Sequence, residues 1–271
     1  MPEVSAKLSE AMRYSALAGG KRIRPVLCLL VAEAAGLHSE AALRAGCAYE
    51  LIHTYSLIHD DLPAMDNDDF RRGRPTSHKV YGEATAILAG DGLLTMAFAW
   101  LAGLADCGVA ADKVVKIIAL AAEAAGHSGM VGGQMLDIAW EKQRAELPVL
   151  ESIHRQKTGA LIRAPILTGA ILAGVPADHC ELLERYAGRI GLLFQIVDDI
   201  LDVVGDAQSL GKTTGRDAIL EKSTYPSLLG LDGAEDYAAR VHAEAVAVVA
   251  QLPPAFSSLK EMADIIFFRK N

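Results

Sequence analysis

Aspartates gather at two places that lie far apart along the chain. The stretch DDLPAMDNDD at 60–69 holds five aspartates in ten residues. Neighbouring carboxylates repel each other by about 1 kcal/mol per pair in water and about 4 kcal/mol at an intermediate dielectric. A solvated acidic loop with helix caps would explain such a run, and so would a cation site. Because the run follows the apolar segment ending in SLIH, its first members should lie at the mouth of the core.

The second cluster stands in the apolar segment LLFQIVDDILDVV at 192–204. Asp198 and Asp202 are one helical turn apart, on the same face, where two like charges destabilise a helix unless something receives them. A buried ion pair with Arg or Lys would satisfy them as well as a metal would. Two such clusters in one chain favour the metal, and ligand sets made only of oxygen favour Mg²⁺.

Positive charge is concentrated in short stretches between and around these clusters. A single lysine is usually a surface cation, but a set that alternates with acidic clusters predicts a different chemistry. Carboxylates would hold the metal while Arg and Lys hold phosphate oxygens, which is a diphosphate site bridged by Mg²⁺. The chain has no GxxxxGK[ST] nucleotide loop. The candidate cations are Lys21, Arg24, Arg71, Arg72, Lys157, Lys212 and Lys222.

Other polar groups carry two interpretations each. His53 lies seven residues before Asp60, on roughly the same helical face, and either belongs to the core or faces phosphate. Tyr55 is either a core residue or the floor of a cavity below the aspartates. The sequence Gly-Gly-Gln at 132–134 could form a turn with a polar side chain, but a helix start or a packing amide is the preferred interpretation.

The segments that carry these candidate residues have the sequence pattern of helices. Apolar residues recur at helical spacing, β-branched runs are short, and the stretch 71–82 is a Gly- and Pro-containing loop. We therefore expect an all-α fold: one large helical bundle, a single domain over residues 1–271, in which two helices present carboxylates to a central cavity. The expected helices are 5–17, 25–35, 40–59, 83–105, 112–125, 148–173, 178–204, 234–251 and 256–268.

Composition narrows the class of protein. The 271 residues carry a formal net charge of −8, which argues against non-specific nucleic-acid binding. The four cysteines show no zinc spacing and are expected to be buried thiols in a reducing compartment. The first residues lack the apolar core of a signal peptide, and we see no uninterrupted apolar run of about 20 residues. We expect a cytoplasmic protein without a membrane span.

Over nearly its whole length the sequence resembles the trans-prenyl diphosphate synthases, and it is especially similar to bacterial farnesyl diphosphate synthases. The two aspartate motifs together are highly specific. Relative to the family, the first helix is expected to be shortened. The motifs occur in the family's order: GGKRIRP, HTYSLIHDDLPAMDNDDFRRGRPTSHKVYGEATAILAGD, GGQMLD, HRQKTGALIRA, FQIVDDILDVVGD, LGKTTGRD and KSTYP.

The resemblance implies a role for each matching residue. About three Mg²⁺ ions are expected per active site. Asp60 and Asp66 would hold two of them, with Asp61 nearby, and Asp198 the third, supported by Asp202. Asp199 is implied as a further catalytic residue of the second motif. The residues implied in allylic diphosphate binding are Arg71, Lys157, Thr158, Gln195, Lys212 and Lys222, with Lys157 also catalytic. Those implied in isopentenyl diphosphate binding are Lys21, Arg24, His53 and Arg72.

The implied reaction is ionisation of the allylic diphosphate, attack by isopentenyl diphosphate and loss of a proton, in a homodimer. Tyr55, five residues before Asp60, and Ser56, four before it, match chain-length positions, and the aromatic side chain resembles farnesyl (C15) producers. Geranylgeranyl (C20) and geranyl (C10) products are the alternatives. A terpene cyclase is disfavoured because both motifs and the isopentenyl-site cations are present. The intact motifs also disfavour a non-catalytic partner subunit.

Overall fold

The structure is a computed structural model, and it describes residues 6–204 and 222–269. Within these residues almost all regular structure is helical, which confirms the all-α prediction. The elements, in chain order, are α1 (Ala6–Ala16), α2 (Ile23–Ala34), α3 (Glu40–Asp60), β1 (Phe70–Arg71), β2 (Arg74–Pro75), α4 (Ser77–Tyr81), α5 (Glu83–Ala102), η2 (Ala105–Cys107), α6 (Ala111–Ala125), α7 (Met130–Ala139), α8 (Leu147–His154), η3 (Arg155–Gly159), α9 (Ala160–Ala173), α10 (Ala177–Val204), α13 (Tyr225–Leu229), α14 (Leu231–Val249), η4 (Pro254–Phe256) and α15 (Ser258–Phe268).

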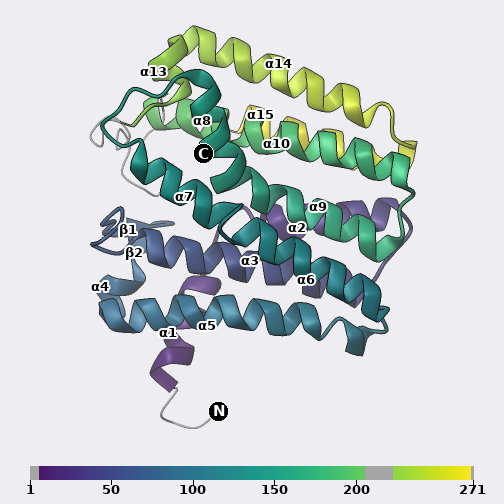
Figure 1. Cartoon of the computed structure of the whole chain (residues 1–271), viewed down its shortest axis with the longest axis horizontal. Helices are drawn as coiled ribbons and strands as arrows, with labels where there is room; N and C mark the ends of the chain where they lie inside the picture. The colour runs from purple at the N-terminus through teal and green to yellow at the C-terminus, as the bar shows by residue number, and fades with distance from the viewer. Residues whose placement is uncertain (1–5, 205–221, 270–271) are drawn as a thin grey trace.

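The helices stack in layers: α14 packs beside α10, α3 packs beside α5, and α1 lies at the edge of the molecule (Figure 1). One hydrophobic cluster of the described residues centres on α10, α14 and α15, and another on α3, α5 and α6. Helices α2 and α9 lie between them. Leu27 of α2 and Ile162 of α9 belong to the first cluster, whereas their neighbours Cys28 and Leu161 belong to the second. Both faces of these two helices are therefore buried.

Close packing fixes α3, the helix that carries the first aspartates. A Cβ at Gly46 would stand 2.9 Å from the Cα of Pro25, so glycine lets α3 approach the first turn of α2. Tyr49 of α3 and Thr168 of α9 share a buried hydrogen bond of 2.7 Å between their hydroxyls. Ser39 begins α3 by accepting a hydrogen bond from the backbone N–H of Ala41. The first half of α3 is thus held against both α2 and α9.

Several predicted boundaries were correct and several details were wrong. The Gly-Gly-Gln sequence lies inside α7, a helix that was not predicted, and the interpretation as a helix start fits better than the turn. The predicted loop at 71–82 contains a short hairpin, in which Phe70 pairs with Pro75, and the five-residue α4. The segment 148–173 is helical throughout, but its residues 155–159 form a π-helical turn. The predicted helix 83–105 ends at Ala102.

Two further expectations need correction or comment. Only Cys28 is a fully buried thiol; the other three cysteines are half-buried, and all four are unbridged. Within the described part of the chain, the segments Glu83–Cys107 and Ala111–Ala139 are long and apolar enough to cross a membrane by length and composition alone. Because core helices of soluble proteins share these properties, this is weak evidence, and the absence of a membrane span stays a prediction.

Candidate active site

The first aspartate cluster folds back on the end of α3. The backbone N–H of Asp66 donates to the carbonyl of Asp60 at 2.8 Å, and that of Asp68 donates to the carbonyl of Asp61 at 3.2 Å. This turn returns the chain to the end of the helix, so Asp60 and Asp66 stand beside each other. The two predicted Mg²⁺ ligands of this cluster are therefore adjacent, as the prediction requires.

Asp61 is engaged differently from its neighbours. It is 4% exposed, and one of its oxygens accepts a hydrogen bond from the Nε of Arg71 at 2.5 Å. Burial raises the pKa of Asp61 to about 6, although Arg71 partly offsets this rise. Arg71 also donates to Asp68 at 3.1 Å. The predicted allylic-site arginine thus holds the aspartate loop together in this structure.

Two lysines approach the aspartates from other elements. The ammonium group of Lys222 lies 3.7 Å from Asp66 and 3.1 Å from Asp137, and that of Lys157 donates to Asp137 at 2.7 Å. Burial by itself would raise the pKa of Asp137, but the two ammonium groups outweigh it and hold the pKa below its usual range. Asp137 was not predicted as a site residue. Its only signal was its place at the end of the GGQMLD motif.

Lys157 and Thr158 stand in the π-helical turn η3, between α8 and α9. The wider π register changes the direction of side chains relative to an α-helix, and such turns are frequent at functional sites. Burial raises the pKa of Asp60, and the charge of Lys157 partly offsets this rise. Lys157 is therefore within electrostatic reach of the first aspartate cluster as well as of Asp137.

In the second cluster, on α10, only Asp198 is substantially exposed. Its side chain is 33% exposed, whereas Asp199 and Asp202 are buried. The guanidinium of Arg269 lies 3.3 Å from an oxygen of Asp198 and 4.2 Å above the ring of Phe194. The predicted pair Asp198 and Asp202 therefore divides into a carboxylate at the surface of the site and one behind it. Arg269 was not predicted.

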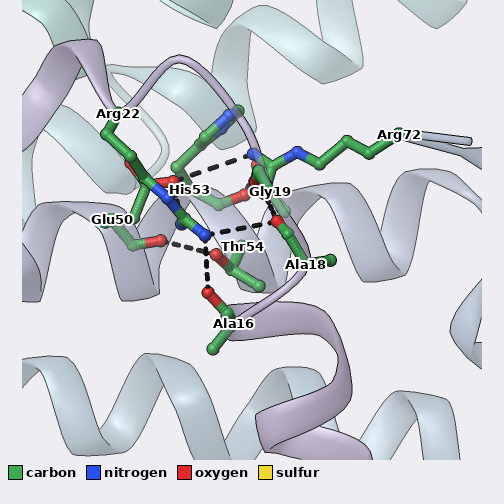
Figure 2. Close-up of polar contacts among 9 residues, drawn as sticks. Ala16, Ala18, Gly19, Arg22, Glu50, His53, Thr54 and Arg72 are labelled. Atoms are coloured by element: carbon green, nitrogen blue, oxygen red, sulfur yellow. Dashed lines mark hydrogen bonds and ion pairs between the residues drawn. The ribbon is translucent and has the colours of Figure 1, made fainter. Parts of the chain in front are cut away.

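The predicted isopentenyl site contains a buried carboxylate that the sequence reasoning missed (Figure 2). Glu50 accepts from Arg22 at 2.6 Å and lies 3.7 Å from Arg72. Arg22 and Arg72 also donate to backbone carbonyls of the loop between α1 and α2, at Ala18 among others. These contacts fix the loop that carries Lys21, whose side chain is exposed. The backbone φ of 50° at Arg22 shows how tightly the loop turns.

His53 and Arg24 lie beside this ion-pair cluster. Burial, together with Arg24 and Arg72, holds the pKa of His53 well below its usual range, so His53 is neutral at pH 7. Burial lowers the pKa of Arg24 to about 10, which leaves it a cation. The Nε of Arg24 and the second oxygen of Glu50 are buried with no hydrogen-bond partner among the described residues.

One cavity of about 420 Å³ is lined by residues of α2, α3 and η3; Asp66, Asp198 and Lys222 are not part of its lining. Its polar lining includes Arg24, His53, Asp60, Lys157 and Thr158, and its apolar walls include residues of α7. Tyr55 lies in the wall, and its ring meets His59 edge to face at 5.6 Å. The hydroxyl of Ser56 donates to the carbonyl of His53. A larger hollow of about 670 Å³ lies behind η3, and its lining does not include the aspartate motifs.

The chemistry of the candidate ligands suits Mg²⁺. No three His, Cys, Asp or Glu side chains stand close enough to hold a metal by themselves in residues 6–204 and 222–269. Mg²⁺ does not need such a cluster, because it usually takes one or two carboxylates and completes its shell with water and substrate phosphate. Asp60, Asp66 and Asp198 offer oxygen ligands only, which fits. Lys212, the remaining predicted cation, lies outside the described residues.

Fold and cavity together define a helical-bundle enzyme for diphosphate chemistry, and comparison with known proteins gives its family. The family model for polyprenyl synthetases matches residues 5–252. The chain belongs to this family and is a trans-prenyltransferase. It is 48% identical over 270 residues to a chloroplastic geranylgeranyl pyrophosphate synthase of Capsicum annuum, covering 97% of this chain and 72% of the relative.

Two bacterial relatives complete the comparison. The chain is 47% identical over 263 residues to farnesyl diphosphate synthase of Bacillus subtilis, covering 97% of this chain and 88% of that protein. A geranyltransferase of Helicobacter pylori, solved in complex with magnesium and isoprenyl diphosphate, superposes with a TM-score of 0.85 at 35% identity. That alignment covers 96% of this chain and 86% of the other. The fold class is therefore the all-α fold of the prenyltransferases.

Proposed function

We propose that this chain condenses isopentenyl diphosphate with dimethylallyl and then geranyl diphosphate, and so makes farnesyl diphosphate in a Mg²⁺-dependent reaction. The observation that carries the proposal is a single cavity lined by Arg24 and His53, by Asp60 and Lys157, and by the aromatic ring of Tyr55. Arg24 and His53 would receive one diphosphate, and the lysines near the aspartates would receive the other. Tyr55 lines the same cavity, where a growing apolar chain would meet its ring.

The chemical step is the one that membership of the family implies. The bond between C1 and oxygen of the allylic diphosphate breaks, and the electron pair leaves with the diphosphate. The double bond of isopentenyl diphosphate attacks the resulting allylic cation and forms the new carbon–carbon bond. A proton is then lost to the departed diphosphate, so the products are a chain longer by five carbons and free diphosphate. No protein base is needed for this sequence.

Protein groups stabilise the developing charges, orient the substrates and exclude water. Lys157 and Lys222 lie where they would stabilise the negative charge that develops on the leaving group. Asp60, Asp66 and Asp198 would hold Mg²⁺, which when bound supplies further charge stabilisation to the same oxygens. The Thr158 hydroxyl lines the cavity and would place its dipole near the cation. The apolar walls exclude water that would otherwise trap the cation.

Product length is the finer part of the proposal. Burial of five more carbons gains roughly 0.8 kcal/mol per CH₂, or about 4 kcal/mol, so apolar affinity alone would favour further growth. Growth must therefore be stopped by steric contact, and Tyr55 is the aromatic group in the cavity wall one helical turn and a half from Asp60. This supports C15. A C20 product is the second candidate, because the Capsicum annuum relative is a geranylgeranyl pyrophosphate synthase.

The proposed activity is tested by diphosphate release. Purified protein is incubated with isopentenyl and dimethylallyl diphosphates, with Mg²⁺ or with a chelator, and with each substrate alone as a control. We expect diphosphate release only when both substrates and Mg²⁺ are present. Release of diphosphate from dimethylallyl diphosphate alone would indicate a hydrolase or cyclase instead, and no release in any mixture would reject the enzyme proposal.

We also propose that the chain works as a homodimer in the cytoplasm. Helices α5 and α6 are in contact, and each exposes apolar side chains: Leu88 is 56% and Val115 is 65% exposed. A second copy packed on this face would remove these groups from water. Light scattering on the purified protein measures the mass. A mass of one chain at micromolar concentration, unchanged in a Leu88→Lys variant, would contradict the dimer.

A further inference from the structure

Three side chains behind the cavity form one continuous line of hydrogen bonds. The amide nitrogen of Gln195 donates to Oδ1 of Asp199 at 2.8 Å, and the hydroxyl of Thr158 donates to the amide oxygen of Gln195 at 3.0 Å. Thr158 lines the cavity, while Asp199 is 3% exposed on the far side of the line. This chain of hydrogen bonds therefore runs from the buried carboxylate of Asp199 to the wall of the cavity.

The chemistry of the carboxylate fixes the direction of every bond in this line. An ionised carboxylate only accepts hydrogen bonds, so the NH₂ end of Gln195 must face Asp199. The carbonyl end of the same amide then faces Thr158. A threonine hydroxyl has one hydrogen, and that hydrogen is used on Gln195. What Thr158 presents to the cavity is thus the lone-pair side of its oxygen, which is the negative end of the dipole.

Asp199 is itself held by a second contact. Its Oδ2 accepts a hydrogen bond from the backbone N–H of Tyr225, at the start of α13, at 3.1 Å. A backbone N–H cannot turn away without moving the helix, so this contact fixes the carboxylate from the side opposite Gln195. Asp198, one residue earlier, is partly exposed and contacts Arg269. The two adjacent aspartates therefore differ in exposure and in the groups they contact.

We propose that Asp199 is a positioning residue that sets the polarity of the Thr158 hydroxyl, so that this hydroxyl offers its oxygen lone pairs to the carbon cation formed in the cavity. The inference rests on the proposed prenyl-transfer function and adds a role for Asp199 that is distinct from metal binding. On this proposal the acceptor character of Asp199 matters most. A hydrogen-bond donor at position 199 would reverse the amide of Gln195 and, through it, the hydroxyl of Thr158.

An asparagine at this position makes the reversal directly. In Asp199→Asn the amide oxygen stays with the fixed N–H of Tyr225, and the new NH₂ group faces Gln195. Gln195 must then turn its oxygen toward Asn and its NH₂ toward Thr158. The Thr158 hydroxyl becomes an acceptor, and its hydrogen is free to turn into the cavity, where its positive end opposes a cation. The side chains keep nearly the same shape, so the change is mainly electrostatic.

The test is a double-mutant cycle on turnover, combining Asp199→Asn with Thr158→Val. We expect Asp199→Asn alone to lower kcat about tenfold, or ~1.4 kcal/mol in barrier height, while the Mg²⁺ concentration for half-maximal rate changes by less than about twofold. In the Thr158→Val background, which has no hydroxyl to reverse, Asp199→Asn should change kcat by less than about twofold. Asp178→Asn, an exposed aspartate of the same helix, is the matched control and should leave turnover unchanged.

Equal effects of Asp199→Asn in both backgrounds would overturn the inference. So would a large rise in the Mg²⁺ requirement with kcat at saturation unchanged, because that result would make Asp199 a metal ligand. A second double-mutant cycle measures the free energy of unfolding and does not depend on activity. In it, the double variant Asp199→Asn with Gln195→Leu should lose less stability than the sum of the two single variants. Additive losses there would reject the hydrogen-bond line itself. Absence of activity in the wild type would instead reject the proposed function and leave this second cycle to decide.

Discussion

Glu50 offers the sharpest test of how the cation cluster is built. It is the carboxylate that faces Arg22 at 2.6 Å and Arg72 at 3.7 Å, and its side chain is 11% exposed. In Glu50→Gln the amide oxygen still accepts a hydrogen bond, so shape is kept and the negative charge is lost. The cluster then holds its arginines without a countercharge.

The size of the effect follows from the burial of the pair. Removal of one partner costs about 3–5 kcal/mol for a fully buried pair, and exposed pairs contribute about 0–1 kcal/mol. The side chain of Arg22 is 30% exposed, so an intermediate loss of about 2 kcal/mol is expected. For a protein of this size, about 2–4 °C of melting temperature corresponds to each kcal/mol, so Tm should fall by roughly 4–8 °C.

Thermal unfolding with and without inorganic diphosphate provides the assay. Because the variant lacks its internal anion, added diphosphate should raise its Tm by more than it raises that of the wild type. Glu33→Gln is the matched control: Glu33 is an exposed glutamate on the neighbouring helix α2, and its loss should leave Tm unchanged. A Tm of Glu50→Gln within about 1 °C of the wild type, or an equal rise of Tm with diphosphate in both proteins, would refute the stabilising role of Glu50.

Three other predictions concern product length, turnover and pH. Tyr55→Ala should shift the product from C15 toward C20 in mass spectra, while Tyr81→Ala, outside the cavity lining, should not; an unchanged spectrum would move the floor to another residue. Asp198→Ala should stay folded, with some loss of Tm because Arg269 loses its carboxylate partner, yet lose nearly all turnover; wild-type activity would remove its metal role. Burial lowers the pKa of His154 from 6.5 to about 4, so stability present above pH 6.5 is lost as the pH falls to about 4. In His154→Phe the pH-dependent loss should shrink by up to about 3 kcal/mol in denaturant titrations, and an equal loss in both proteins would refute this assignment.

The long helices could be predicted because their apolar spacing is regular and Gly or Pro marks their ends. Helix α7 could not, because its two adjacent glycines have the local signature of a turn. Its packing supplies the reason for one of them: a Cβ at Gly133 would stand 2.1 Å from the backbone nitrogen of Lys157. Tertiary contact with η3 therefore outweighed the local preference, and such contact is not visible in sequence.

The candidate site was predictable in its residue types and less so in their partners. Spacing indicated that Asp60 and Asp198 belong to acidic clusters; Asp60 lines the cavity, and Asp198 is partly exposed on α10. Spacing did not show that Asp61 is bound by Arg71, or that Asp199 is buried behind Gln195. Glu50 was missed because a single glutamate in a helix has no distinguishing pattern. Its role depends on arginines 28 residues before it and 22 after it, which only the fold brings together.

The most direct test of the account is the identity of the product. Purified protein is given isopentenyl and geranyl diphosphates with Mg²⁺, and the dephosphorylated products are separated and weighed by mass spectrometry. The account predicts a C15 alcohol as the main product, and none when Mg²⁺ is chelated. A main product of C20 under limiting isopentenyl diphosphate, or no elongated product at all, would contradict it.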